Sequence, residues 1–157
     1  MGKRRAGREL ALKLLFQIDV GKLPPEEALA FAADTAHYEE EALAFARELV
    51  EGVLAHRAAI DQAVESYSRG WTLSRMANMD RNILRIAAFE VLFSPGVPAS
   101  VAADEAVELA NKYSTAESGR FINGILGSLI RCPPEGAPPS PPDPGSRGRD
   151  QNPPPNV

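Results

Sequence analysis

The sequence has few of the residues on which catalytic and metal sites are built. Among its 157 residues there is one cysteine, Cys132, and there are two histidines, His37 and His56. A single cysteine excludes an intramolecular disulfide and a thiolate metal cluster. The histidines fall in different predicted segments, and neither belongs to a metal-ligand spacing such as HExxH. Phosphate-binding glycine loops and the GxSxG motif are also missing. We therefore expect that the protein is not an enzyme and that it binds no metal and no other cofactor.

Long apolar runs and a strong charge imbalance are missing as well. No stretch approaches the ~20 apolar residues that cross a bilayer. The basic N-terminus leads into Glu9, Lys13 and Gln17 rather than into the apolar core of a signal peptide. We therefore expect a soluble, cytoplasmic protein without membrane contact. The formal net charge of -4 excludes a uniformly basic surface, but a local basic patch remains compatible with it.

Proline is scarce in the interior and concentrated at the end of the chain. Residues 133–157 hold ten of the 14 prolines and no aromatic residue. Such a segment cannot bury enough apolar area to offset the entropy lost on ordering it. We therefore expect one folded domain over residues 1–132 and a disordered, proline-rich tail over residues 133–157. The body is long enough for one hydrophobic core and too short for two.

Between the few proline and glycine breaks, apolar residues recur at helical spacing, and no alternating run of strand length occurs. This pattern predicts an all-α protein of seven helices. They run from about Arg5 to Val20, from Pro25, from Glu39 to His56, from near Arg57 through Tyr67, from Asp80 to Phe93, from Pro98 through Ala110, and from Ser114 to Cys132.

Two of these helices carry further signals. The segment from Asp80 to Phe93 is apolar around too much of its circumference for a surface helix, so we expect it at the centre. Asp80 is the predicted N-cap of this helix. The sequence from Ser114 to Glu117 matches a capping box, which predicts the start of the last helix.

The first eight residues contain four cations, Lys3, Arg4, Arg5 and Arg8. We expect residues 1–8 to form a flexible basic arm that leads into the first helix. Such clusters are typical of segments that neutralise RNA phosphates, although basic N-termini also serve only to solubilise. Four phosphate contacts on a single strand predict a slope of log affinity against log salt of about -3. Contacts of this kind give salt-dependent binding without base recognition.

Base recognition requires stacking or base-edge contacts from the folded body. Tyr67, Tyr113 and Phe121, the last beside Arg120, are the candidate aromatic residues. Aromatic residues at helical spacing are usually part of a core, so spacing alone favours a core position over a surface role. Trp71 is interpreted as a core side chain between the two halves of the bundle.

Four segments carry a more specific pattern. They are RRAGRELALKLLFQ at 4–17, DRNILRIAAFEVL at 80–92 followed by Val97-Pro98, EAVELANKY at 105–113, and SGRFINGIL at 118–126. In order and spacing these segments resemble the NusB family of bacterial transcription antitermination factors. The resemblance spans about Arg4 to Ile130 and leaves out the proline-rich tail.

The resemblance implies a fold of two perpendicular three-helix bundles that share a long central helix. It also implies a non-catalytic protein that binds the boxA element of nascent RNA together with NusE, a small-subunit ribosomal protein. In the family this pair joins other Nus factors on RNA polymerase and suppresses premature termination in ribosomal RNA operons.

The same resemblance assigns two kinds of contact. The RNA contacts fall on the basic arm, on one tyrosine and on the first turn of the last helix: Lys3, Arg4, Arg5, Arg8, Tyr67, Glu117, Ser118, Arg120 and Phe121. The NusE contact falls on the acidic residue that heads the central helix, Asp80.

Two other interpretations remain open. Ribosomal RNA cytosine methyltransferases carry a similar N-terminal RNA-binding domain, but they need a catalytic α/β unit, so this interpretation requires the chain to be a fragment. Alternatively, the chain is a helical interaction module without RNA affinity, for example a homodimer that covers the arm. Salt-dependent binding to a boxA-like RNA distinguishes the RNA-binding antitermination factor from the interaction module without RNA affinity.

Overall fold

The computed structural model describes residues 2–35 and 38–134. Within these ranges it contains seven α-helices, one short 3-10 helix and no strand, which confirms the predicted all-α fold. The elements are α1 (Gly2–Asp19), α2 (Pro25–Thr35), α3 (Glu40–Ala55), α4 (Arg57–Ser66), η1 (Leu73–Arg75), α5 (Asn78–Phe93), α6 (Ala99–Tyr113) and α7 (Ala116–Arg131). Apart from its first two residues, the predicted tail lies outside the described residues, and so does His37.

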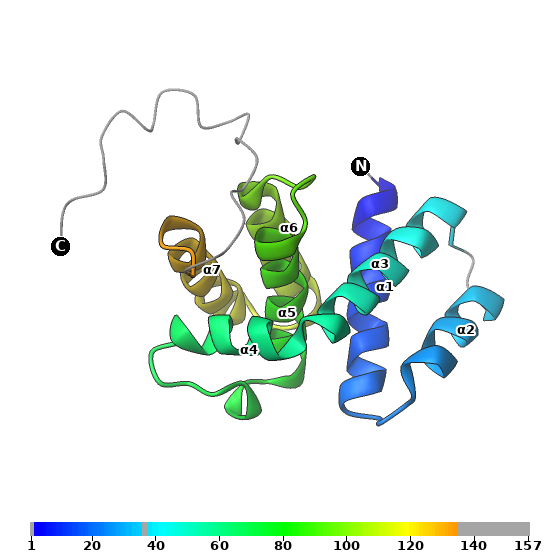
Figure 1. Cartoon of the computed structure of the whole chain (residues 1–157), viewed down its shortest axis with the longest axis horizontal. Coiled ribbons are helices and arrows are strands. Elements are labelled where there is room, and N and C mark those ends of the chain that lie inside the picture. The colour runs from blue at the N-terminus through cyan, green and yellow to red at the C-terminus, as the bar shows by residue number, and fades with distance from the viewer. Residues whose placement is uncertain (1, 36–37, 135–157) are drawn as a thin grey trace.

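The helices form two groups that meet at α5 (Figure 1). One group consists of α1, α2 and α3, and the other of α4, α6 and α7. Helix α5 packs against α1 and α3 in the first group and against α4, α6 and α7 in the second. Twelve of its 16 residues are buried, so its wide apolar face does place it at the centre. One contact is especially close: a Cβ on Gly52 of α3 would lie 2.2 Å from Cζ of Phe89 on α5.

Two predicted helix caps differ from the structure. Helix α5 begins at Asn78 after Ala77, so the prediction of Asp80 as its N-cap is wrong, and Asp80 lies inside the first turn. The N-cap of α7 is Thr115 rather than Ser114, and its hydroxyl oxygen accepts a hydrogen bond from the backbone N–H of Ser118 at 2.9 Å. Helix ends are the least certain feature of an apolar pattern because adjacent polar residues can all serve as caps.

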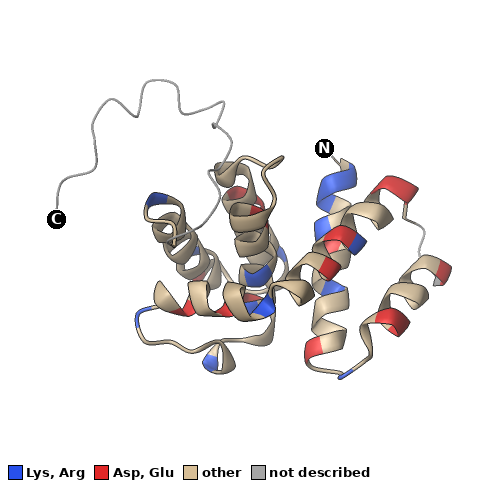
Figure 2. Ribbon diagram, viewed as in Figure 1, with Lys and Arg blue, Asp and Glu red and all other residues tan. Residues whose placement is uncertain are grey.

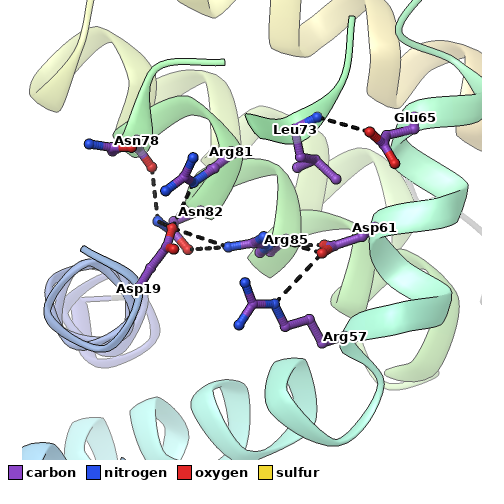
Figure 3. A network of polar contacts seen from close by, with 9 residues as sticks. All are labelled: Asp19, Arg57, Asp61, Glu65, Leu73, Asn78, Arg81, Asn82 and Arg85. Atoms are coloured by element: carbon purple, nitrogen blue, oxygen red, sulfur yellow. Dashed lines mark hydrogen bonds and ion pairs between the residues drawn. The ribbon is translucent and has the colours of Figure 1, made fainter. Parts of the chain in front are cut away.

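A polar network joins α1, α4 and α5 (Figure 3). Arg85 donates from Nε and Nη2 to the two carboxylate oxygens of Asp61 at 2.9 and 3.2 Å, and from Nη1 to Oδ2 of Asp19 at 3.3 Å. The same Oδ2 accepts hydrogen bonds from Nε of Arg81 at 2.7 Å and from Nδ2 of Asn82 at 3.0 Å. Because Arg85 of α5 binds both Asp19 at the end of α1 and Asp61 on α4, the network fixes one helix group against the other.

This network makes the stability of the fold depend on pH. Burial raises the pKa of Asp19, but hydrogen bonds from Arg81 and Asn82 and the charges of both arginines outweigh it and hold the pKa below the ordinary 3.8. A carboxylate with a lowered folded-state pKa stabilises the fold above its unfolded-state pKa, and this contribution is lost as the pH falls through the folded-state value.

We therefore expect Asp19→Asn to destabilise the protein at neutral pH and to matter progressively less as the pH falls below about 4. Thermal melting of both proteins between about pH 7 and pH 3 measures the difference. Melting curves that stay separated by the same interval at every pH would contradict the role given to this carboxylate.

Candidate nucleic-acid interface

The basic N-terminal residues are helical rather than extended as a flexible arm. Helix α1 begins at Gly2, so the four cations lie on its first two turns, contrary to the prediction of an unstructured segment. Figure 2 shows this basic end of α1 beside the acidic start of α3. The cations therefore have fixed neighbours, and their individual surroundings decide which of them a phosphate can reach.

Two of the exposed cations contact α3 and the residue before it. Nζ of Lys3 lies 3.4 Å from Oε2 of Glu39 and 3.3 Å from Oε1 of Glu41. These carboxylates raise the pKa of Lys3 through hydrogen bonds and charge. The guanidinium of Arg4 lies 5.0 Å from the ring centroid of Phe45 in a cation–π contact. Both side chains remain exposed. Their role as RNA contacts stays a prediction.

Arg8 does not belong to the exposed set. Its Nε and Nη2 donate to Oε1 and Oε2 of Glu90 at 2.8 and 2.7 Å, and the two side chains are only 4% and 1% exposed. A phosphate cannot reach this guanidinium without opening the core, so the expected RNA contact at Arg8 is corrected to a structural ion pair. The sequence contains a signal for this: Arg8 shares the α1 face of Leu12 and Leu15, both of which are buried.

Arg5 and Arg120 line one groove of about 650 Å³ between α1, α6 and α7. We call it the Arg5 groove. Its α6 wall carries the carboxylates of Asp104, Glu105 and Glu108. The structure thus brings together two predicted RNA contacts that are far apart in sequence. It also places beside them three acidic residues that sequence reasoning did not single out.

A second hollow, of about 380 Å³, lies on the other side of the first turn of α7. We call it the Asp80 pocket. It is lined by Trp71, Arg75, Met76, Ala77, Asp80, Thr115, Glu117, Ser118 and Phe121. Asp80 is 7% exposed, and its Oδ2 accepts a hydrogen bond from the hydroxyl of Ser118 at 2.8 Å. Its Oδ1 is buried and has no hydrogen-bond partner in the described part of the chain. An unpaired buried carboxylate oxygen is costly, so Oδ1 would gain from a donor that a rearrangement of the pocket brings to it.

Trp71 is a functional candidate that the sequence interpretation missed. The prediction of a core side chain is wrong, because 53% of the residue is exposed. It follows a turn in which Arg69 and Gly70 both have positive φ, 53° and 88°, and this turn separates it from α4. Its neighbours in sequence behave differently: Leu73 and Met76 are buried. The glycine at position 70, directly before Trp71, is typical of a turn, and this is the sequence feature that could have indicated an exposed position for Trp71.

Tyr67 lies apart from the other predicted contacts. It is half-buried, and its hydroxyl donates a hydrogen bond to the carbonyl oxygen of Cys132 at the end of α7. Glu117, Ser118, Arg120 and Phe121 are all at the opposite end of that helix. The structure therefore joins the first turn of α7 to Arg5 and Asp80 but leaves Tyr67 out of this group.

Two negative findings concern the described residues alone. Over 2–35 and 38–134 no group of three or more His, Cys, Asp or Glu side chains is placed to hold a metal ion. No helix in that part of the chain is long and apolar enough to cross a membrane.

Comparison with known proteins decides the family. Residues 5–131 match the model of the NusB family. The transcription antitermination protein NusB of Symbiobacterium thermophilum is 51% identical over 136 residues, which cover 82% of this chain and 89% of that protein. The chain belongs to the NusB family. The NusB protein of Heliobacterium modesticaldum is 49% identical over 128 residues, but this match spans only 62% of its length and 82% of this chain.

Solved NusB structures share the fold. NusB of T. maritima superposes with a TM-score of 0.76 at 36% identity, covering 86% of this chain and 93% of that one. A chain in the crystal structure of antitermination factors NusB and NusE in complex with dsRNA matches with a TM-score of 0.75 at 24% identity, covering 83% of this chain and 98% of that one. The curated NusB relatives are named for antitermination rather than for a catalytic activity, in agreement with the predicted non-catalytic class.

Proposed function

We propose that this member of the NusB family is a non-catalytic RNA-binding antitermination factor that binds boxA RNA together with NusE and suppresses premature termination in ribosomal RNA operons. Membership of the NusB family supports a role in transcription antitermination. The observation that carries the proposal is the placement of two different hollows on either side of the first turn of α7. One is bordered by arginines, and the other by aromatic side chains and a carboxylate with one oxygen that lacks a hydrogen-bond partner.

The RNA contacts are proposed for the Arg5 groove and its surroundings. Lys3, Arg4 and Arg5 are exposed at one end of α1, and Arg120 is exposed at the start of α7. Arginines placed in this way bind backbone phosphates, which position an RNA strand without reading its sequence. Base contacts are proposed for the neighbouring first turn of α7, including Glu117 and Phe121.

The protein partner is proposed for the Asp80 pocket. Trp71 offers exposed apolar surface in its lining, and Oδ1 of Asp80 lacks a hydrogen-bond donor. A basic or amide side chain with an apolar stem satisfies both features. The solved complex of NusB and NusE with dsRNA shares this fold, which makes NusE and RNA the partners to test for this chain.

The proposal has four further parts. They are an indirect link to RNA polymerase through other Nus factors, action in the cytoplasm, a helical domain over residues 1–132, and a separate tail over residues 133–157. A homodimer that covers the start of α1 is the competing proposal. It predicts that the isolated protein binds boxA-like RNA without salt dependence or not at all.

We expect replacement of Lys3, Arg4 and Arg5 by alanine to weaken RNA binding and to flatten its salt dependence. Three phosphate contacts on a single strand contribute about -2 to the slope of log affinity against log salt, and this contribution should disappear. The melting temperature should stay nearly unchanged because all three side chains are exposed. Fluorescence anisotropy with a short boxA RNA at several salt concentrations measures the slope.

Arg47→Ala is the matched control, because Arg47 is an exposed arginine on α3 that borders neither hollow. An unchanged slope in the triple variant, or an equal loss of affinity in the Arg47 variant, would remove this end of α1 from the RNA site.

A further inference from the structure

Arg5 is exposed, yet it has a carboxylate partner held in place by the fold. Its Nε and Nη2 donate to Oε2 and Oε1 of Glu105 at 3.2 and 3.3 Å. The Glu105 side chain is only 15% exposed, whereas the Arg5 side chain is 56% exposed. The acid therefore lies in the wall of the groove on α6, and the arginine is the more accessible member of the pair.

The contact uses an edge of the guanidinium that also suits a phosphate. Nε and Nη2 present two parallel N–H donors, which match two oxygens of a carboxylate or of a phosphate equally well. One edge cannot bind both anions at once, so a phosphate that takes this edge must displace Glu105. The neighbouring carboxylates of Asp104 and Glu108 add repulsion toward any anion entering the Arg5 groove.

The influence of Glu105 on Arg5 is distinct from that of the other acids on α6. The hydrogen bond from Arg5 to Glu105 is the largest cause of the raised pKa of Arg5, followed by the charge of Glu105. Glu108 acts on the same pKa only through its charge. Glu108 is therefore a control of equal charge, on the same helix and in the same groove, without the bidentate contact.

We propose that Glu105 competes with RNA phosphates for Arg5 and thereby sets the RNA affinity of this protein. The inference rests on the proposed RNA-binding function and adds to it a residue that reduces affinity. In the free protein Glu105 holds the guanidinium, and on binding the phosphate replaces the carboxylate. Part of the gain from each Arg5–phosphate contact is lost in breaking the internal pair.

The test compares Glu105→Gln and Glu108→Gln, each alone and combined with Arg5→Ala, for binding to a short single-stranded boxA RNA. Glutamine keeps the shape of the side chain and removes its charge. We expect Glu105→Gln to tighten binding about two- to fivefold, the range that corresponds to an exposed ion pair. Glu108→Gln should have a smaller effect. With Arg5 replaced by alanine, Glu105→Gln should do no more than Glu108→Gln.

Three results would overturn the inference. Weaker binding by Glu105→Gln would mean that the acid positions Arg5 for RNA instead of competing for it. An equal gain with and without Arg5 would mean that only the general charge of the groove matters. Absence of RNA binding by the wild type and by both glutamine variants would overturn the proposed function itself, whereas wild-type binding that Glu105→Gln leaves unchanged would overturn the inference alone.

Discussion

Replacing Glu90 with alanine is expected to lower the free energy of unfolding by about 3–5 kcal/mol, a large part of the stability of a domain of this size. The change leaves the guanidinium of Arg8 buried without its partner, since the two side chains are 4% and 1% exposed and bind each other at 2.7 and 2.8 Å. Urea denaturation followed by circular dichroism measures the loss. Arg8→Ala should have an effect of similar size, because it strands the carboxylate instead.

Two controls make this expectation specific. Arg5→Ala breaks an exposed pair and should leave the denaturation midpoint nearly unchanged. Replacing both Arg8 and Glu90 by apolar side chains of similar volume should restore most of the stability, because no unpaired charge then remains in the core. A destabilisation of Glu90→Ala no larger than that of Arg5→Ala would contradict the burial of the pair and would return Arg8 to the set of candidate RNA contacts.

Trp71→Ala is expected to weaken NusE binding about 30-fold while leaving RNA binding by the isolated protein unchanged. Tryptophan is among the residues most enriched at the hot spots of protein interfaces, with losses of about 2 kcal/mol or more on truncation. Asp80→Asn should weaken the same interaction, because it removes the charge of the buried oxygen that lacks a donor. Isothermal titration calorimetry with NusE measures both variants.

Val101→Ala is the matched control for this prediction, since Val101 is another exposed apolar side chain and lies outside both hollows. The asparagine at position 80 can still accept the hydrogen bond from Ser118, so the variant tests charge rather than folding. If Trp71→Ala and Val101→Ala weaken NusE binding equally, the Asp80 pocket is not the partner site.

The helices were predictable because apolar spacing encodes burial locally. The central position of α5 follows from its wide apolar face, and the structure confirms it with contacts to both helix groups. Helix boundaries were less well determined, as Asp80 shows: it occupies the first turn of α5 rather than its cap, and binds the hydroxyl of Ser118 on α7. That partner is 38 residues away in sequence, so no local pattern indicates it.

The candidate site was predictable only in part, for the same reason. The sequence indicates that Lys3, Arg4, Arg5 and Arg8 form a basic cluster, but the role of each depends on residues that are distant in sequence. Arg8 pairs with a residue 82 positions away and Arg5 with one 100 positions away. Helical spacing on α1 separates the buried arginine from the exposed ones. It contains no information about which carboxylate on another helix will face each of them.

The most direct test of the central claim is a binding measurement with this protein, alone and mixed with NusE, on a short boxA RNA and a scrambled control at two salt concentrations. We expect the protein alone to bind RNA more weakly as salt increases. Addition of NusE should tighten binding to the boxA sequence more than to the scrambled one. Binding that is absent, or that responds neither to RNA sequence nor to NusE, would contradict the antitermination function while leaving the NusB fold intact.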